Sequence, residues 1–366
     1  MLGWVRTREY DPVKKDLQTK VSVIVPVRNE GKNILKCLAD ILKQDISPNL
    51  FEVLVIDDHS EDNTVQVIEH LLKTDTSFPQ VLKLLKPDGI KTSYKGKKAA
   101  IQQAVEHASG QLIVTTDADC RMNPMWLSTI VNYYETYSPK MISGPVSFRK
   151  ERTLFGKLQT LEFLSLIGSG AAAIGNKIPL MCNGANLAYE RAAFFQAGGY
   201  NTPGQLASGD DVTLMLSMHK QYPGEIHFLK AWNAVVYTDA VPNLREFFVQ
   251  RVRWASKTFK VSNWAVSGVA ITVFIANLIT LAGILTFPFL SSAICCNIFM
   301  RVLTYFVIIK VSLDSIFLSF MLFFFKRKDL LLLILPAQFI YSFYIVLVGT
   351  VSTFSRTYRW KGRIVR

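Results

Sequence analysis

Charged residues are missing from two long stretches of this 366-residue chain, 261–300 and 330–355. A helix that crosses a membrane needs about 20 mainly apolar residues, and the segments 265–290 and 330–355 both exceed that length. We therefore predict a membrane span in each. The sequence before about Pro242 has the character of an ordinary soluble domain.

The apolar segment 291–325 differs from these spans because it carries Arg301, Lys310 and Asp314. A charged side chain that faces lipid is costly. On one helix Lys310 and Asp314 would share a face and pair, since they are four residues apart. We expect a single span with that pair turned toward protein. A tight pair of helices is the alternative, so the chain has three or four spans in all.

Cysteine and histidine are scarce, with five of each, and none has the spacing of a metal site. The cysteines lie mostly in apolar surroundings, which fits a reducing compartment. The sequence also lacks a glycine-rich dinucleotide fingerprint after its first predicted strand, and it lacks a Walker-type phosphate loop. These absences argue against a zinc protein, a dinucleotide oxidoreductase and a P-loop ATPase.

The formal charge of +13 is distributed in a way that indicates a membrane rather than nucleic acid. The basic residues form no compact block with interleaved aromatics. They lie beside the apolar segments, at 251–260, 326–328 and 356–366, as the positive-inside rule and anionic headgroups predict. The segment 1–15 is polar without an apolar core, so we expect no secretory signal. The expected location is the cell membrane, multi-pass, with the soluble domain before Pro242 in the cytosol.

Strand and helix patterns alternate in the first part of the chain. The predicted strands are 21–25, 53–56 and 112–116, and the predicted helices are 34–42, 65–72 and 100–108. This alternation predicts an α/β fold with a mainly parallel, doubly wound sheet. In such sheets ligands bind beyond the carboxyl ends of the strands, which is where the polar residues of this sequence lie.

Asp117 and Asp119 follow the third predicted strand and are separated by one small residue. In extended chain both carboxylates project to one side, about 6 to 7 Å apart at the backbone. Mg²⁺ and Mn²⁺ prefer such oxygen ligands and bind through one or two carboxylates plus substrate phosphates. This Asp-x-Asp pair therefore predicts a metal site, and a solvated acidic turn is the alternative.

Two pairs of adjacent aspartates are compatible with both capping and chemistry. Asp57 and Asp58 follow the second predicted strand, where a carboxylate can accept the imide N–H of uracil or cap the next helix. Asp210 and Asp211 open another helical pattern. They are either a helix cap or a general base, which needs a carboxylate within reach of an acceptor hydroxyl.

Gln250, Arg253 and Trp254 lie at positions i, i+3 and i+4, so a helix places them on one face. Arg and Trp on a surface helix serve membrane anchoring in many proteins. In a site, Arg253 would counter a diphosphate leaving group, and the Trp254 ring would stack on a sugar or line the acceptor channel.

Taken together, these elements resemble the family 2 glycosyltransferases, which have the GT-A fold. The matching segments, in the order of the family, are Val21 to Glu30, Val55 to Ser60 with Asp62 and Thr64, Gly96-Lys97 with Ala100, Asp117-Ala118-Asp119, Gly184-Ala185-Asn186 with Arg191, Gly198-Gly199-Tyr200, Gly209-Asp210-Asp211, and Gln250 to Trp254. They cover about two-thirds of the chain, residues 21 to 254.

The resemblance implies a Rossmann-like domain that binds a nucleoside diphosphate sugar. The residues implied to line the nucleotide pocket are Pro26, Arg28, Glu30, Asp58, Lys97 and Asp117. Asp117 and Asp119 would bind Mg²⁺ or Mn²⁺, and Asp211 would be the base with Asp210 beside it. The Gln-x-x-Arg-Trp motif at Gln250, Arg253 and Trp254 is similar to that of processive polysaccharide synthases and of ceramide glucosyltransferase-like enzymes.

Two departures from the family pattern leave assignments open. Gln102 stands where the family often has Asn, so no role is assigned to it. The second acidic motif is Gly209-Asp210-Asp211 rather than Glu-Asp or Thr-Glu-Asp, so either aspartate can be the base.

The predicted organisation is a catalytic domain over 1–240, an amphipathic interface helix over 241–263 with the Gln-x-x-Arg-Trp motif, and a transmembrane region over 264–366 with a basic tail. The predicted function is inverting, metal-dependent transfer of a hexosyl group to a lipid-linked or surface-glycan hydroxyl. A processive polysaccharide synthase is the main alternative. A non-catalytic membrane scaffold is disfavoured because every acidic motif is present.

Overall fold

The computed structural model describes residues 1–13, 16–74, 80–86, 96–200, 210–258, 263–290, 298–354, 358–360 and 363–365. The chain divides into two compact units. The first comprises residues 1–149 and 167–239, and the second comprises residues 150–166 and 240–366. The predicted boundaries at residues 240 and 263 stay predictions.

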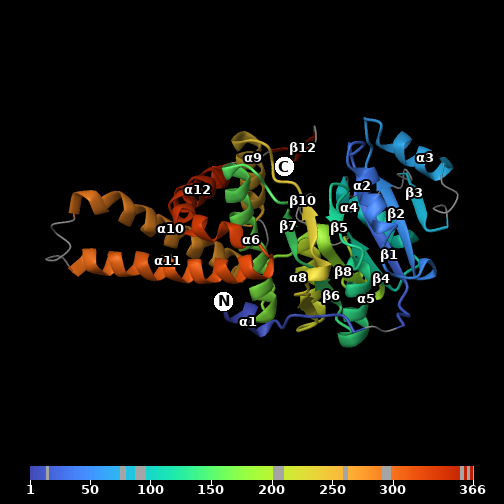
Figure 1. Cartoon of the computed structure of the whole chain (residues 1–366), viewed down its shortest axis with the longest axis horizontal. Coiled ribbons are helices and arrows are strands. Elements are labelled where there is room, and N and C mark those ends of the chain that lie inside the picture. The colour runs from blue at the N-terminus through green and yellow to red at the C-terminus, as the bar shows by residue number, and fades with distance from the viewer. Residues whose placement is uncertain are drawn as a thin grey trace. The chain divides into compact units, whose positions relative to one another are not determined.

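A seven-stranded sheet forms the centre of the first unit, with the strand order β3-β2-β1-β4-β8-β6-β9 (Figure 1). Its strands are β1 (Val21–Val27), β2 (Phe51–Asp57), β3 (Leu82–Leu85), β4 (Leu112–Thr115), β6 (Met141–Ser143), β8 (Leu187–Glu190) and β9 (Ile226–Phe228). The four strands from β3 to β4 are parallel, whereas β8 is antiparallel to both β4 and β6. The predicted α/β fold with a mainly parallel sheet is confirmed.

Burial on both faces explains the continuous apolar runs of the central strands. Val23, Ile24 and Val25 in β1 are completely buried, as is typical of a parallel sheet covered by helices on both sides. The helices of this unit are α1 (Leu2–Arg6), α2 (Ile34–Ile41), α3 (Thr64–Thr74), α4 (Lys97–His107), α5 (Trp126–Tyr137), α7 (Arg191–Gln196) and α8 (Asp210–Gln221). The predicted helices at 34–42, 65–72 and 100–108 correspond to α2, α3 and α4.

A second sheet of three strands has the order β5-β10-β7. It consists of β5 (Arg121–Met122), β10 (Val236–Thr238) and β7 (Val146–Phe148). In this sheet Tyr237 of β10 lies opposite Arg121 of β5. The sheet therefore brings Thr238 close to the chain that follows Asp119, although the two are 119 residues apart.

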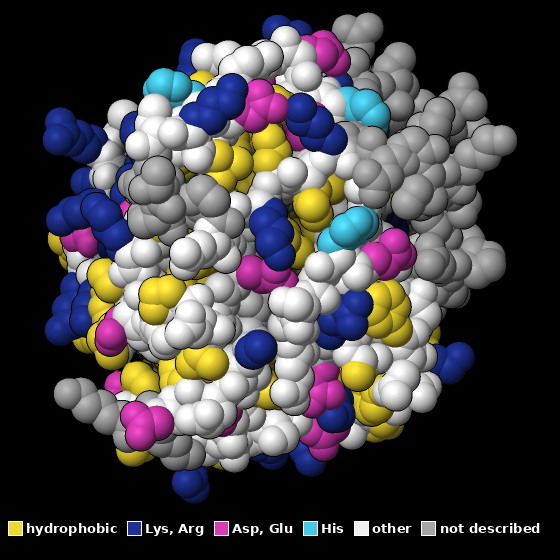
Figure 2. Space-filling view, turned by 90° about the vertical axis from the view of Figure 1, so that its right-hand side faces the viewer, with side chains coloured by type: hydrophobic (Ala, Val, Ile, Leu, Met, Phe, Trp, Pro, Cys, Tyr) yellow, Lys and Arg dark blue, Asp and Glu magenta, His cyan; other side chains and the backbone are white. Residues whose placement is uncertain are grey.

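The end of the first unit that faces the viewer in Figure 2 carries mixed charge. Acidic and basic side chains are interspersed there between small hydrophobic areas. This pattern is typical of an ordinary soluble surface.

The second unit is built from long helices. They are the first part of α6 (Leu154–Gly175), α9 (Leu244–Thr258), α10 (Trp264–Leu290), α11 (Ile298–Phe324) and α12 (Ile334–Phe354), with the short helix η4 (Lys328–Leu333) before α12 and a hairpin of β11 (Tyr358–Trp360) and β12 (Arg363–Val365). Figure 1 shows α10 and α11 side by side.

Within the described residues, four helical segments are long and apolar enough to cross a membrane: Leu154–Gly175, Trp264–Thr286, Ile298–Phe324 and Lys328–Thr353. Two of them coincide with the predicted spans at 265–290 and 330–355. The helix α6 was not predicted. It also differs from α10 in that 61% of its most apolar stretch is buried, against 11% in α10.

Lys310 and Asp314 of α11 pair as the sequence predicts. Arg301, Lys310 and Asp314 lie on one helix, and the Lys310 ammonium is 3.0 Å from a carboxylate oxygen of Asp314. The ammonium also donates to Asn277 of α10 at 3.1 Å and to Gln338 of α12 at 3.2 Å. Lys310 is therefore turned toward the neighbouring helices, while the Asp314 side chain is 45% exposed. Residues 291–297 of the predicted segment lie outside the described residues.

Candidate active site

The predicted polar residues gather at one edge of the large sheet. The strands β1, β2 and β4 are parallel neighbours, with Val27 of β1 opposite Asp57 of β2 and Ile24 opposite Thr115 of β4. Their carboxyl ends therefore lie at the same edge, where ligands of doubly wound sheets bind. Pro26 fits this place because β1 pairs with β4 only as far as Ile24, so its missing N–H does not interrupt that ladder.

Asp119 lies in a group of carboxylates at this edge. Its burial raises the pKa of its carboxyl group to about 6, and the negative charges of Asp117 and Glu30 act in the same direction. The hydroxyl of Thr238 opposes the shift by donating to Asp119 Oδ2 at 3.2 Å. The three carboxylates thus form a negatively charged cluster, and a cation placed there would stabilise it.

Lys97 is the first residue of α4, and its ammonium is 2.5 Å from Asp117 Oδ1. The preceding Gly96 has φ 84°, a conformation that glycine adopts without steric cost. This turn starts the helix so that Lys97 reaches the aspartate pair. The structure thus brings one residue of the predicted nucleotide pocket into contact with one of the predicted metal ligands.

The donor set at this edge fits a hard divalent cation that shares its coordination with a substrate. Among the described residues, no group of three or more His, Cys, Asp and Glu side chains is arranged to hold an ion without other ligands. Two aspartates are nevertheless the number that Mg²⁺ sites commonly use when substrate phosphates supply further oxygens. The residues that would hold the ion are Asp117 and Asp119.

Arg28 connects the end of β1 to the loop that follows β2 through hydrogen bonds. Its guanidinium donates to the carbonyl oxygens of Asp58 at 2.7 Å and of His59 at 2.9 Å, and it pairs with Glu61 at 2.9 Å. With its side chain 6% exposed, Arg28 fixes the loop that carries Asp58. The amide of Asp58 in turn donates to the Val27 carbonyl at 2.8 Å.

Asp57 and Asp58 were predicted either to cap the next helix or to bind a ligand, and the structure shows Asp62 at the start of that helix, α3, in place of Asp57. The first turn of α3 receives its side-chain acceptor from Asp62, whose Oδ1 accepts the amide of Thr64 at 3.0 Å. Asp57 instead accepts the amide of Ser60 at 3.2 Å, within the loop. Asp58 follows Asp57 in the same loop and is buried at the end of the strand.

Asp211 is linked by hydrogen bonds to the strand that precedes the Asp-x-Asp pair. Its Oδ2 accepts the amide of Gly184 at 3.0 Å, and the carbonyl of Gly184 accepts the hydroxyl of Thr115, the last residue of β4, at 3.0 Å. The Gly184–Asn186 turn therefore connects the first turn of α8 to the end of β4. Asp210 begins α8, but its side chain and residues 201–209 lie outside the described residues.

Three hydrogen bonds explain why the last residue of this turn, Asn186, is an asparagine. Its amide nitrogen donates to the carbonyls of Pro145 and Ala234, each at 2.8 Å, and its oxygen accepts the indole N–H of Trp126 at 3.0 Å. All three contacts are buried. A methyl group added at Gly144 would lie 2.3 Å from the amide nitrogen, so the close approach requires glycine there.

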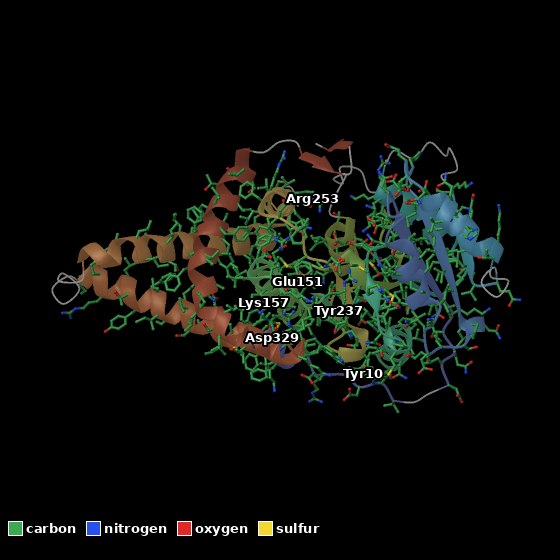
Figure 3. The ribbon with its side chains drawn as sticks, turned by 45° about the horizontal axis from the view of Figure 1, so that its top comes forward. Tyr10, Glu151, Lys157, Tyr237, Arg253 and Asp329 are labelled. Carbon is green, nitrogen blue, oxygen red and sulfur yellow. The ribbon has the colours of Figure 1, made fainter. Side chains whose placement is uncertain are left out.

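The Gln-x-x-Arg-Trp motif lies on α9, in the second unit (Figure 3, where Arg253 is labelled). Gln250, Arg253 and Trp254 are all partly buried. The Trp254 ring lies 6.3 Å from the ring of Phe163 on α6. The motif thus lies on a helix, as predicted, and this helix packs against α12 as well as α6.

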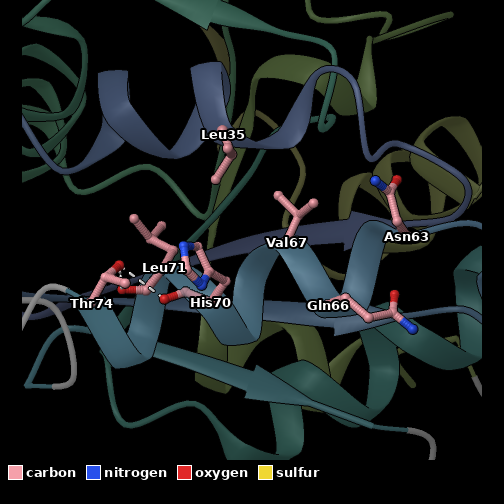
Figure 4. Close-up of a pocket in the computed structure, with 7 residues that line it drawn as sticks. All are labelled: Leu35, Asn63, Gln66, Val67, His70, Leu71 and Thr74. Carbon is pink, nitrogen blue, oxygen red and sulfur yellow. Dashed lines mark hydrogen bonds between the residues drawn. The ribbon is translucent and has the colours of Figure 1, made fainter.

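A pocket of about 300 Å³ lies between α2 and α3 (Figure 4). It is lined by Leu35, Asn63, Gln66, Val67, His70, Leu71 and Thr74. Its walls are mainly apolar, and it includes none of the predicted catalytic, nucleotide or metal residues. The strand-end cluster is therefore the stronger candidate for chemistry.

The sequence did not indicate two residues of this site. Thr238 contacts Asp119 from a strand that begins 117 residues later. No local sequence pattern predicts this contact. Thr115 was predicted only as a strand residue. Its position in β4 shows which face of the sheet it occupies. Its partner Gly184, however, is placed by the antiparallel strand β8, which the pattern of strands and helices did not predict.

Comparison with known families decides the classification. Residues 112–347 match the model described as "Glycosyl transferase family group 2", and residues 22–195 match the one described as "Glycosyl transferase family 2". The first match covers more than half of the chain. The chain belongs to glycosyltransferase family 2. The predicted family is therefore confirmed.

A solved structure shares the fold of this family 2 chain, and a curated relative shares part of its sequence. A mannosyltransferase from Pyrobaculum calidifontis, solved in complex with GDP-Man and Mn²⁺, has a similar fold, with a TM-score of 0.54 and 18% identity over 96% of this chain and 92% of that one. "Glycosyltransferase AglE" of Haloferax volcanii is 32% identical over 128 residues, which are 35% of this chain and 40% of that protein.

Two further relatives match a larger part of the chain. "Beta-monoglucosyldiacylglycerol synthase" of Trichormus variabilis is 24% identical over 69% of this chain and 52% of its own length. "Poly-beta-1,6-N-acetyl-D-glucosamine synthase" of Staphylococcus epidermidis is 22% identical over 64% of this chain and 53% of its own length. The family 2 chain thus spans about half or less of the length of these curated relatives.

Proposed function

We propose that this family 2 member transfers a hexosyl group from a nucleoside diphosphate sugar to an acceptor hydroxyl, with inversion at the anomeric carbon. The observation that carries the proposal is the cluster of Glu30, Asp117 and Asp119 at the strand ends, with Asp211 linked to the same strand through Gly184. The fold likeness to a mannosyltransferase solved with GDP-Man and Mn²⁺ supports this class of donor and metal.

Asp117 and Asp119 are the proposed ligands of Mg²⁺ or Mn²⁺. When bound, the ion supplies positive charge that neutralises the departing diphosphate. Thr238 holds Asp119 by its hydroxyl, and Lys97 holds Asp117. These contacts fix the two carboxylates before the donor arrives, which is the preorganisation that electrostatic catalysis needs.

The remaining residues of the proposed nucleotide pocket surround this pair. Pro26 and Glu30 lie at the end of β1, and Asp58 lies beyond β2 on the loop fixed by Arg28. Asp58 would accept a base N–H from this loop. Arg28 would act through the loop as well as through its charge.

Asp211 is the proposed general base. Its Oδ2 accepts the Gly184 amide and its Oδ1 accepts the Val212 amide at 2.9 Å, so the carboxylate is oriented by backbone contacts. It would take the proton of the acceptor hydroxyl as the oxygen attacks the anomeric carbon. In the Gln-x-x-Arg-Trp motif, Arg253 would counter the leaving diphosphate, and Trp254 would stack on the sugar or line the acceptor channel. Gln250 would complete the motif's polar face.

The four apolar helices support a membrane-bound enzyme. We propose a multi-pass protein of the cell membrane with its catalytic domain in the cytosol. The proposed acceptor is the hydroxyl of a lipid or of a lipid-linked or surface glycan, to which one or a few sugars are added. The named product of the Trichormus relative favours a lipid acceptor, whereas that of the Staphylococcus relative favours a processive polymerase as the second candidate.

The test uses the full chain in lipid nanodiscs with a panel of UDP- and GDP-sugars, supplied with Mg²⁺ or Mn²⁺ and a membrane lipid extract. We expect release of nucleoside diphosphate together with a glycosylated lipid product of inverted anomeric configuration, measured by NMR. Product length separates the two candidates, since a polymer indicates the synthase. A matched carboxylate control is Glu69→Gln, which alters a surface pair with Lys86 and should leave turnover unchanged.

Two outcomes would contradict the proposal. If no donor is consumed under any condition, the chain is the non-catalytic scaffold instead. If transfer occurs equally in excess chelator, the proposed role of Asp117 and Asp119 is wrong.

A further inference from the structure

A buried ion pair joins α9 to α6 in the second unit. The Arg251 side chain is 2% exposed and the Glu162 side chain is 9% exposed. The Nε atom of Arg251 lies 2.9 and 3.0 Å from the two carboxylate oxygens of Glu162, and Nη2 lies 2.5 Å from Oε2. The pairing is therefore bidentate, the geometry in which Arg forms its strongest and most directional contacts.

A third helix contacts the same carboxylate. Tyr344 of α12 donates its hydroxyl to Glu162 Oε1 at 3.2 Å, and Tyr341 donates to the carbonyl of Leu158 on α6 at 2.6 Å. The ion pair thus lies where α6, α9 and α12 meet. The carboxylate and the guanidinium both have several partners, so neither charge is left unsatisfied in this buried position.

The guanidinium also contacts two residues of the Gln-x-x-Arg-Trp motif. It lies 4.3 Å from the centroid of the Trp254 ring and 4.5 Å from that of Phe247, so it is stacked on two aromatic residues of its own helix. Its Nη1 donates to the side-chain oxygen of Gln250. One buried side chain therefore fixes the orientation of both Gln250 and Trp254.

Stability alone is a weak reason for such a pair. Replacing a buried ion pair by apolar residues of similar volume is often neutral or stabilising, whereas removing one partner is strongly destabilising. Arg contributes what an apolar residue cannot, because its planar fork pairs with a carboxylate while its faces stack on aromatic rings. Those are the contacts that hold Gln250 and Trp254.

We infer that Arg251, anchored by Glu162, is a positioning residue for the Gln-x-x-Arg-Trp motif and sets the orientation of Trp254 and Gln250 for sugar transfer. This inference rests on the proposed function. Arg251 is too buried to touch the substrate, so it acts through its two neighbours. Arg251 is one of the two residues between Gln250 and Arg253, and it therefore contributes to the geometry of the motif itself.

The test removes the ion pair without leaving a lone charge. The double variant Arg251→Met/Glu162→Leu should keep a melting temperature near that of the wild-type protein. Its kcat should fall about 10- to 100-fold, because small misplacements of groups at the reacting centre cost up to about 10²-fold in rate. The KM for the donor should change less than threefold, since the proposed nucleotide pocket is not altered.

The matched control is another arginine pair of the second unit. Arg327 is 8% exposed and makes two hydrogen bonds to Asp329, at 3.0 and 3.2 Å. Among the contacts of the described residues, none joins this pair to Gln250 or Trp254. The variant Arg327→Met/Asp329→Asn should therefore keep the kcat of the wild-type protein. A control loss equal to that of the Arg251 variant would overturn the inference.

A second variant covers the case in which the double variant does not fold. Arg251→Lys keeps the charge for Glu162 but removes the planar fork, so it should fold and lose at least half of its kcat. If the double variant folds and keeps full kcat, the inference is wrong. If the double variant does not fold and Arg251→Lys keeps full kcat, the inference is also wrong. Failure of the proposed function has a different result, in which the wild-type protein itself transfers no sugar.

Discussion

Replacement of Asp211 by Asn is the most direct test of the proposed mechanism. The carboxylate accepts two backbone amides, from Gly184 at 3.0 Å and from Val212 at 2.9 Å. An Asn side chain has one oxygen and can keep only one of these contacts. The loss of one hydrogen bond to a charged group costs about 1.5 to 3 kcal/mol of stability, so the variant should fold with a lower melting temperature.

The kinetic loss should be larger than the loss of stability. General base catalysis accounts for about 10² to 10⁴ in rate, which corresponds to about 2.7 to 5.4 kcal/mol of transition-state stabilisation. We expect kcat to fall in that range while the affinity for the donor stays within about twofold, because Asp211 is not a proposed nucleotide or metal contact. Steady-state kinetics and donor titration by calorimetry measure the two quantities separately.

Glu135→Gln is the matched control for this variant. The Glu135 carboxylate also accepts two backbone amides, from Gln18 and Thr19 at 2.8 Å each, but it lies on α5 and not at the strand ends. Both amides donate to Oε1, so the Gln oxygen can keep both contacts. The variant should therefore lose less stability than Asp211→Asn and keep its kcat. Near-normal turnover of Asp211→Asn would refute the assignment of the base. A large loss in Asp210→Asn instead would exchange the roles of the two aspartates.

Four further outcomes are expected. Asp119→Ala should abolish transfer and weaken donor binding in the presence of Mn²⁺ while the protein still folds, and wild-type turnover that survives excess chelator would contradict this. Thr238→Val removes the hydroxyl on Asp119 and should raise the Mn²⁺ concentration for half-maximal activity several-fold; an unchanged metal dependence would show that the contact has no role. The full chain should stay with the membrane fraction after carbonate extraction, and recovery in the supernatant would defeat the proposed anchoring. Burial alone would raise the pKa of Glu52, but hydrogen bonds from Ser109, Lys83 and Ser22 outweigh this effect and lower the pKa to about 2. The ionised carboxylate therefore stabilises the fold by up to about 3 kcal/mol. This contribution should be lost as the pH falls from about 4.5 toward 2. Melting temperatures of wild type and Glu52→Gln should converge over that range, and parallel curves would reject the assignment.

The local elements of the fold could be predicted because their signals are local. The buried runs of β1, β2 and β4 and the helical spacing in α2 lie within windows of a few residues, and the ends of parallel neighbours then place polar residues at one edge. The family order of motifs extended this to Asp211. These inferences needed no knowledge of which distant segments meet.

The contacts that organise the site could not be predicted, because they join segments with no shared periodicity. Thr238 and Asp119 are 119 residues apart, and Arg251 and Glu162 are 89 apart. The antiparallel β8 between β4 and β6 likewise follows from tertiary pairing. Glu162 lies on α6, whose repeated small residues and even distribution of apolar side chains gave no amphipathic pattern to recognise.

The ammonium of Lys310 contacts three apolar helices that follow one another in the chain. Its partners Asn277, Asp314 and Gln338 belong to α10, α11 and α12 respectively. During synthesis α10 and α11 emerge first, and until α12 follows, the charge has only part of its final coordination. A chain that ends before Gln338 therefore lacks one acceptor of this ammonium, although the charge is already paired with Asp314 of the same helix. Completion of α12 adds the acceptor Gln338, and Lys310 then joins all three helices by polar contacts.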